Sequence, residues 1–133
     1  SIKDAVGDFE FSKKQLELLK DKVDIYSGND NQTYDFVING GVGVVSVASH
    51  VVGDEISEMI SFAKDNDLEK AEEINMQLSN LFEAIFEEPS PGPIKKILSE
   101  SWEEVGEPLL PITSITPELA NKIRGFYKKI KEN

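Results

Sequence analysis

The spacing of apolar residues predicts alternating strands and helices in the first half of the chain. Residues 8–20 carry apolar side chains at helical intervals with charged residues between them, which predicts a short amphipathic helix. Residues 23–26 form a short β-prone run. Residues 34–38 predict another helix, which ends at residues 39–41 (NGG), where glycine is a common C-cap.

The pattern continues with an unbroken apolar segment at residues 42–47. An apolar run without alternation is typical of a parallel strand that is buried on both faces. Helices are expected at residues 54–64 and 68–86 after it. Strands that alternate with helices in this way indicate a parallel α/β array.

The last third of the chain has a different pattern. Residues 88–93 contain three prolines and predict a stiff connector before a short helix at residues 94–101. Thr116 provides an N-cap ahead of a proline, so a final helix is expected from there to about residue 130. The chain therefore divides into βα units at residues 1–66 and a C-terminal helical region at residues 67–133.

Composition and charge exclude several kinds of protein. The 133 residues include 25 acidic and 14 basic side chains, for a formal net charge of −11. This acidity argues against a nucleic-acid partner, because such binding needs clustered Lys and Arg. No apolar run approaches the roughly 18 residues of a membrane span. The chain has no cysteine, so it forms neither disulfides nor thiolate metal sites. We expect a cytoplasmic protein that does not contact membranes.

Lys3 is the residue that we expect to carry chemistry. It lies near the carboxyl end of a strand that the chain enters in mid-element, and barrel enzymes place catalytic groups at such ends. A lysine enclosed there by apolar neighbours loses its solvation, which favours the neutral amine that attacks carbonyl carbons. The simpler interpretation of Lys3 alone is an ordinary surface lysine.

Four segments in a fixed order strengthen the interpretation of Lys3. Residues 2–8 (IKDAVGD) are followed by residues 26–30 (YSGND) and residues 40–50 (GGVGVVSVASH), and residues 86–95 (FEEPSPGPIK) come last. In this order they resemble the sixth, seventh and eighth barrel strands of the dihydrodipicolinate synthase and N-acetylneuraminate lyase family, and its connector into the C-terminal helices. The resemblance covers essentially the whole chain.

The resemblance implies an α/β fold: the C-terminal part of a (β/α)8 barrel, with about three parallel strands and their helices, plus a C-terminal helical extension. It also implies a class I aldolase of the dihydrodipicolinate synthase type, which is a lyase of lysine biosynthesis. Lys3 would form a Schiff base with pyruvate, and the resulting enamine would attack an aldehyde, aspartate semialdehyde. Neither a metal nor an organic cofactor is expected, because the protonated imine is the electron sink.

The same resemblance assigns further site residues. Val45 would bind pyruvate through its backbone, and Ser27, Gly28 and Asn29 would lie at the mouth of the site. His50, just past a strand end, is expected at the rim. As the only histidine, it forms no histidine-paired triad within the chain.

The chain departs from the family's pattern in three places. Asn29 stands where the family often has an aspartate, and residues 106–108 (GEP) replace the usual Arg-Leu-Pro. The family's proton-relay tyrosine and substrate-binding arginine belong to strands one to five, which this chain lacks. We therefore expect either a complementary N-terminal half or a homo-oligomer, a dimer or tetramer.

Three hypotheses of function remain open from the sequence. The first is the synthase, with the rest of its site outside this chain. The second is another pyruvate-dependent aldolase of the same family, such as a sialic-acid or keto-sugar lyase, because acceptor specificity resides largely in the missing strands. The third is a non-catalytic half-barrel that must associate with a partner.

Overall fold

The computed structural model describes residues 1–132, and within them three strands form one parallel sheet. The strands are β1 (Ile2–Asp4), β2 (Ile25–Ser27) and β3 (Gly43–Val44), paired in the order β1-β2-β3. The first helices are α1 (Phe9–Leu19) and α2 (Thr33–Ile38), the latter preceded by a 3-10 turn, η1 (Asp30–Gln32). They are followed by α3 (Ser49–Lys64), α4 (Leu68–Ala84), α5 (Gly92–Ser101) and α6 (Pro117–Lys131). The predicted parallel α/β array is thus confirmed.

The chain packs as two compact units. The first unit comprises Ser1–Val47 and Asp54–Asn75, and the second comprises Ala48–Gly53 and residues 76–132. Helices α3 and α4 each contribute residues to both units, and Val52 in α3 departs from helical geometry (φ −131°, ψ 37°). These two units are distinguished only by how the residues pack. The predicted division after residue 66, between βα units and a helical region, stays a prediction.

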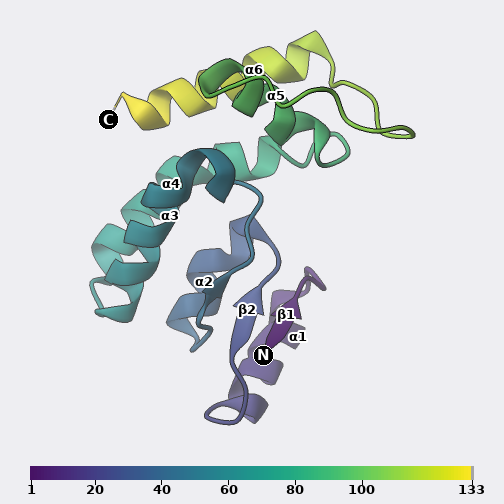
Figure 1. Ribbon diagram of the computed structural model, residues 1–133. Coiled ribbons are helices and arrows are strands. Elements are labelled where there is room, and N and C mark those ends of the chain that lie inside the picture. Colours follow the sequence, from purple (N-terminus) through teal and green to yellow (C-terminus); the bar gives the residue numbers. More distant parts are fainter. Residues whose placement is uncertain (133) are drawn as a thin grey trace. The chain divides into compact units, whose positions relative to one another are not determined.

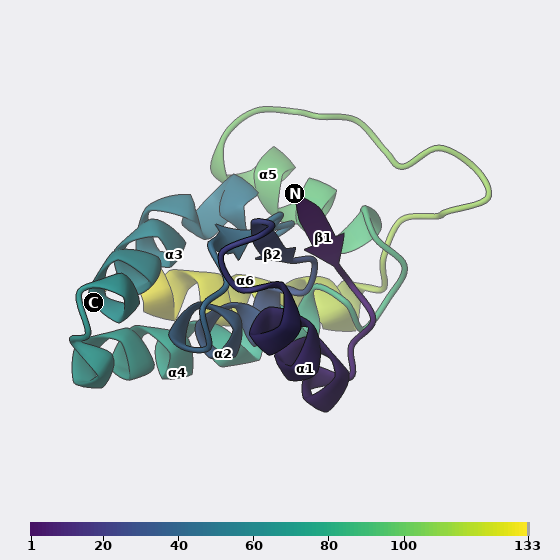
Figure 2. The same cartoon turned by 90° about the horizontal axis from the view of Figure 1, so that it is seen from below.

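In the first unit, α1 and α2 lie on the same face of the sheet (Figures 1 and 2). Helix α1 begins where the Asp8 side chain accepts a hydrogen bond from the Phe11 amide at 3.2 Å, a usual N-cap. Below it, Leu16, Ile25 and Phe36 form a buried cluster that joins α1, β2 and α2. The apolar face of α1 therefore packs against the sheet, as expected for an amphipathic helix.

Strand β3 is shorter than predicted. The apolar run suggested a strand over residues 42–47, but only Gly43–Val44 is a strand. The Val45 amide still donates to the Ser27 carbonyl at 2.8 Å. Beyond it, the Ser46 hydroxyl and the Val47 amide donate to the Asp30 side chain instead. Beyond Val45, the backbone amide of Val47 thus bonds to a side chain and not to a neighbouring strand.

The bounds of β2 and the start of α3 also differ from the prediction. Strand β2 is shifted towards the C-terminus, to Ile25–Ser27 in place of residues 23–26. Helix α3 begins at Ser49, five residues before the predicted start, because its first turn is joined to the rest across the kink at Val52. Apolar periodicity does not detect such a kink, since the buried face continues on both sides of it.

In the second unit, the buried side chains of α4, α5 and α6 are apolar. They include Leu78, Leu81, Phe82, Ile97 and Ile123. The predicted N-cap of the last helix is confirmed, because the Thr116 hydroxyl accepts a hydrogen bond from the Leu119 amide at 3.4 Å. Across residues 1–132, no helix combines the length and the apolar character that a membrane crossing requires.

Candidate active site

The carboxyl ends of β1 and β2 bring the first predicted site residues together. The two strands pair in parallel register, with Lys3 opposite Tyr26 and Asp4 opposite Ser27. Because parallel strands end at the same edge of a sheet, Gly28 lies beside the end of β1. The amide of Gly28 donates to the Asp4 carbonyl at 2.5 Å, which ties the two strand ends together.

Lys3 and Gly28 touch each other on one face of the sheet. A Cβ atom added to Gly28 would lie 3.0 Å from Lys3 Cε, 2.6 Å from Ala5 Cβ and 2.9 Å from the Asp4 carbonyl oxygen. Any side chain at this position would therefore displace the lysine or the backbone beside it. The glycine leaves the space that the Lys3 side chain occupies.

Asp4 determines which way Lys3 points. The Asp4 side chain is buried, and its carboxylate accepts hydrogen bonds from the Ser12 hydroxyl at 2.7 Å and the Val6 amide at 2.9 Å. Since successive side chains of a strand point to opposite faces, anchoring Asp4 beside α1 directs Lys3 to the opposite face. On that face its register neighbour is Tyr26, which in turn is paired with Gly43.

The expected apolar enclosure of Lys3 is not found. Lys3 is exposed in the structure. Its side chain meets a glycine and a half-buried tyrosine on its own sheet face, and neither forms an apolar wall around the amine. The enclosure of Lys3 therefore stays a prediction, because three short strands do not close around the side chains that they carry.

Ser27, Gly28 and Asn29 form a turn at the end of β2. Ser27 is fully buried; its hydroxyl donates to the Asn29 carbonyl at 2.8 Å and accepts from the Asn29 amide at 3.1 Å. The Asn29 side chain donates to Gln32 at 3.2 Å, and Gln32 donates to the Gly7 carbonyl at 3.0 Å. These bonds link the loop after β2 to the loop after β1.

Val45 lies at the end of β3, next to this turn. Its amide is bonded to the Ser27 carbonyl, while its side chain is 49% exposed. The structure therefore places Lys3, Ser27, Gly28, Asn29 and Val45 at the carboxyl ends of three adjacent strands. Their roles in binding or catalysis stay predictions.

His50 is exposed in the first turn of α3 and belongs to the second packing unit. Its predicted place at the rim stays a prediction. Among residues 1–132, no group of three or more His, Cys, Asp or Glu side chains is arranged to hold a metal ion.

The sequence did not single out two polar groups next to these residues, the buried carboxylate of Asp30 and the half-buried hydroxyl of Ser46. Asp30 is only 1% exposed and accepts hydrogen bonds from Ser46 and Val47. In the sequence, Asp30 looks like a turn or capping residue, and Ser46 like one polar position inside an apolar run. A carboxylate directly after one strand and a hydroxyl at the end of the next are the signals that could have suggested their pairing.

The sequence of the chain is similar to those of known proteins. Residues 1–130 match the model of the dihydrodipicolinate synthetase family. The chain belongs to this family. It is 43% identical over 130 residues to a 4-hydroxy-tetrahydrodipicolinate synthase of Microcystis aeruginosa, covering 98% of this chain and 44% of that protein.

Solved structures of the family have the same fold. The dihydrodipicolinate synthase of Cyanidioschyzon merolae, solved with lysine bound, is 35% identical with a TM-score of 0.90, over 97% of this chain and 44% of that one. The Thermotoga maritima enzyme is 27% identical with a TM-score of 0.92, over 98% of this chain and 45% of that one. The predicted likeness to the C-terminal half of this barrel is confirmed. The chain spans less than half the length of the curated relatives that it matches.

Proposed function

We propose that this chain carries the Schiff-base part of a class I aldolase of the dihydrodipicolinate synthase type. The enzyme would condense pyruvate with aspartate semialdehyde. The observation that carries the proposal is the position of Lys3, which lies near the carboxyl end of β1 and packs against Gly28. Family membership supports it, because the matched relatives are named 4-hydroxy-tetrahydrodipicolinate synthase.

In the proposed reaction, the neutral Lys3 amine attacks C2 of pyruvate to give a carbinolamine. Loss of water gives a protonated imine, which draws electrons from the neighbouring methyl group, so that a base removes a proton from C3. The resulting enamine carbon attacks the aldehyde, whose oxygen takes up a proton. Positioned proton transfer typically contributes about 10²–10⁴-fold to the rate, so the acid and base groups matter greatly.

We propose that these acid and base groups come from sequence outside this chain. The relatives are more than twice as long as the matched segment, which leaves room for the other strands of the barrel. Within this chain, Val45 would contribute its backbone to the pyruvate site, with Ser27, Gly28 and Asn29 at its mouth and His50 at its rim. The carboxamide of Asn29 would make that mouth less acidic than an aspartate would.

We further propose that the complete protein acts in the cytoplasm as a dimer or tetramer. The alternative function, another pyruvate-dependent aldolase such as a sialic-acid or keto-sugar lyase, is less well supported because the matched relatives are named as the synthase. Initial rates with aspartate semialdehyde and with sugar aldehydes would distinguish the two, once the chain is joined to the amino-terminal segment of a relative. Faster turnover of a sugar aldehyde would contradict the synthase assignment.

Reductive trapping tests the role of Lys3. The chain is incubated with pyruvate and borohydride, alone and joined to the amino-terminal segment of the Microcystis aeruginosa relative, and the intact mass is measured with peptide mapping. We expect one reduced pyruvate adduct on Lys3. The variant Lys3→Arg should lose it, whereas Lys14→Arg, at another exposed lysine, should keep it.

Each result of this experiment has a clear meaning. An adduct on Lys3 of the chain alone supports a site that functions without the other strands. An adduct only after joining supports a catalytic lysine in a chain that is silent by itself. No adduct in either form, or an adduct that persists in Lys3→Arg, contradicts the Schiff-base mechanism.

A further inference from the structure

The carboxylate of Asp30 joins the ends of β2 and β3 from a buried position. We propose that Asp30 is a positioning residue that holds the Val45 backbone in the conformation that receives pyruvate. This inference rests on the proposed function, in which Val45 lines the pyruvate site. In this proposal Asp30 does not contact the substrate. It positions the segment around Val45, which does.

The contacts of Asp30 fall directly after Val45. The Ser46 hydroxyl donates to Asp30 Oδ1, and the Val47 amide donates to Oδ2 at 3.1 Å. On the other side, the Val45 amide donates to the Ser27 carbonyl at 2.8 Å. The backbone of Val45 is therefore held before and after the residue, by β2 and by the turn that follows β2.

The turn that carries Asp30 is itself well anchored. The Thr33 hydroxyl donates to the Asp30 carbonyl at 2.8 Å, and Thr33 is fully buried. The Gln32 amide donates to the Asn29 carbonyl at 3.2 Å. These bonds hold the backbone of the turn, whereas the contacts with Ser46 and Val47 are made by the Asp30 side chain.

The burial of Asp30 makes these bonds consequential. The Asp30 side chain is 1% exposed, and the Val47 amide that donates to it would lose a hydrogen bond that is costly to leave unmade. Without the carboxylate, the segment 45–47 would move to satisfy the Val47 amide elsewhere. An asparagine could still accept from Val47 and donate to the Ser46 oxygen, so the geometry needs the shape of the side chain more than its charge.

Two substitutions at Asp30 separate the shape of the side chain from its charge. Asp30→Ala removes both acceptors, whereas Asp30→Asn keeps one acceptor and one donor at the same place. Thr33→Val is the matched control, because it removes a buried hydrogen bond from the same turn without touching residues 45–47. All variants are made in the form of the protein in which the unchanged sequence yields the pyruvate adduct.

The first measurement is the rate of borohydride trapping against pyruvate concentration. We expect Asp30→Ala to raise the half-saturating pyruvate concentration about tenfold, because the loss of roughly one hydrogen bond weakens binding by about that factor. The limiting rate of trapping should change much less. Asp30→Asn and Thr33→Val should stay within about threefold of the unchanged protein, which is at most about half the free-energy change of a tenfold effect. Equal effects of Asp30→Ala and Thr33→Val would overturn the inference, because they would indicate general destabilisation.

A second measurement does not depend on pyruvate. Amide hydrogen exchange should show loss of protection at Val47 in Asp30→Ala and retained protection in Thr33→Val. Unchanged protection at Val47 in Asp30→Ala overturns the inference even if pyruvate binding weakens. If the unchanged protein forms no adduct, the proposed function fails and the inference falls with it, while the exchange result still reports whether Asp30 holds this segment.

Discussion

The two packing units differ in where they place their polar side chains. Among the described residues, the buried polar side chains all lie in the first unit: Asp4, Ser12, Ser27, Asp30 and Thr33. The buried side chains of the second unit are apolar, and some of its charged side chains form ion pairs at the surface. The first unit also has a surface ion pair, Lys70 with Asp67, so the units differ in the side chains that they bury.

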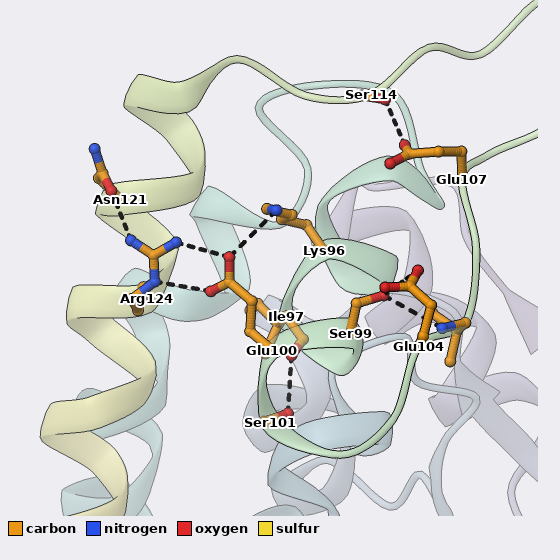
Figure 3. Close-up of polar contacts among 11 residues, drawn as sticks. Lys96, Ile97, Ser99, Glu100, Ser101, Glu104, Glu107, Ser114, Asn121 and Arg124 are labelled. Atoms are coloured by element: carbon orange, nitrogen blue, oxygen red, sulfur yellow. Dashed lines mark hydrogen bonds and ion pairs between the residues drawn. The ribbon is translucent and has the colours of Figure 1, made fainter.

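Figure 3 shows the surface arrangement in the second unit. Arg124 donates from Nε and Nη2 to the two carboxylate oxygens of Glu100, at 2.7 Å each, and from Nη1 to Asn121 at 2.6 Å. Lys96 approaches the same carboxylate at 3.4 Å. This cluster links α5 to α6 on the outside of an apolar core.

The difference shows what each kind of polar group contributes. Exposed ion pairs are typically worth 0–1 kcal/mol, so the second unit depends on its apolar core for stability. A buried hydrogen-bonding group is unfavourable unless its partner is placed well, so it selects one backbone geometry over others. The first unit therefore has a defined geometry at its strand ends, where the candidate site lies.

The largest effect should come from the apolar core of the second unit. Phe82 is 1% exposed, and Phe82→Ala should lower the free energy of unfolding by about 3–5 kcal/mol, as removal of a buried aromatic side chain does. Phe86→Ala is the matched control, because Phe86 is 47% exposed. Urea denaturation measures both. A cost for Phe82→Ala no larger than that of Phe86→Ala would contradict an apolar core in this unit.

An intermediate effect is expected from adding one methyl group in each unit. Gly28→Ala would bring a Cβ within 2.6 Å of Ala5 Cβ, so the backbone must shift, at about 1–3 kcal/mol, and trapping at Lys3 should fall. Gly125→Ala places a Cβ in open space on α6 and should stabilise the chain by about 0.5–1 kcal/mol. Thermal unfolding and pyruvate trapping measure the pair. If Gly28→Ala changes neither the stability nor the trapping of pyruvate, the proposed difference between the two units is contradicted.

The smallest effect should come from the ion pair in Figure 3. The hydrogen bond from Arg124, aided by Lys96, lowers the pKa of Glu100 below its usual value. The pair therefore stabilises the fold above the ordinary carboxyl range, and this contribution is lost as pH falls through the lowered pKa. At pH 7, Glu100→Gln should cost about 0.2–1 kcal/mol, as for other exposed pairs.

The measurement for this pair is urea denaturation at several pH values. The difference between the unchanged chain and Glu100→Gln should shrink towards zero as the solution becomes acidic. Glu103→Gln, at an exposed position of the following turn, serves as the control and should show little difference at any pH. A difference that grows on acidification would show that the ion pair does not act as described.

Much of the architecture follows from local patterns in the sequence. The apolar spacing of residues 8–20 predicted α1, and Thr116 ahead of a proline predicted the start of α6, because periodicity and capping depend on neighbours within a few residues. The resemblance of four short segments, taken in order, also led to the correct family. Lys3 was singled out on the same grounds, from its place at the end of a strand.

What the sequence alone left undecided depends on residues that are far apart in the chain. The pairing of Asp30 with Ser46 spans 16 residues and lies just after β3, and the contact of Gly28 with Lys3 joins two separate strands. No local pattern predicts which buried carboxylate meets which backbone segment, because that choice depends on the register of the sheet. The sequence by itself determined most of the elements and the family. The tertiary structure decided how the strand ends are held, because hydrogen bonds between distant residues form only once the sheet has assembled.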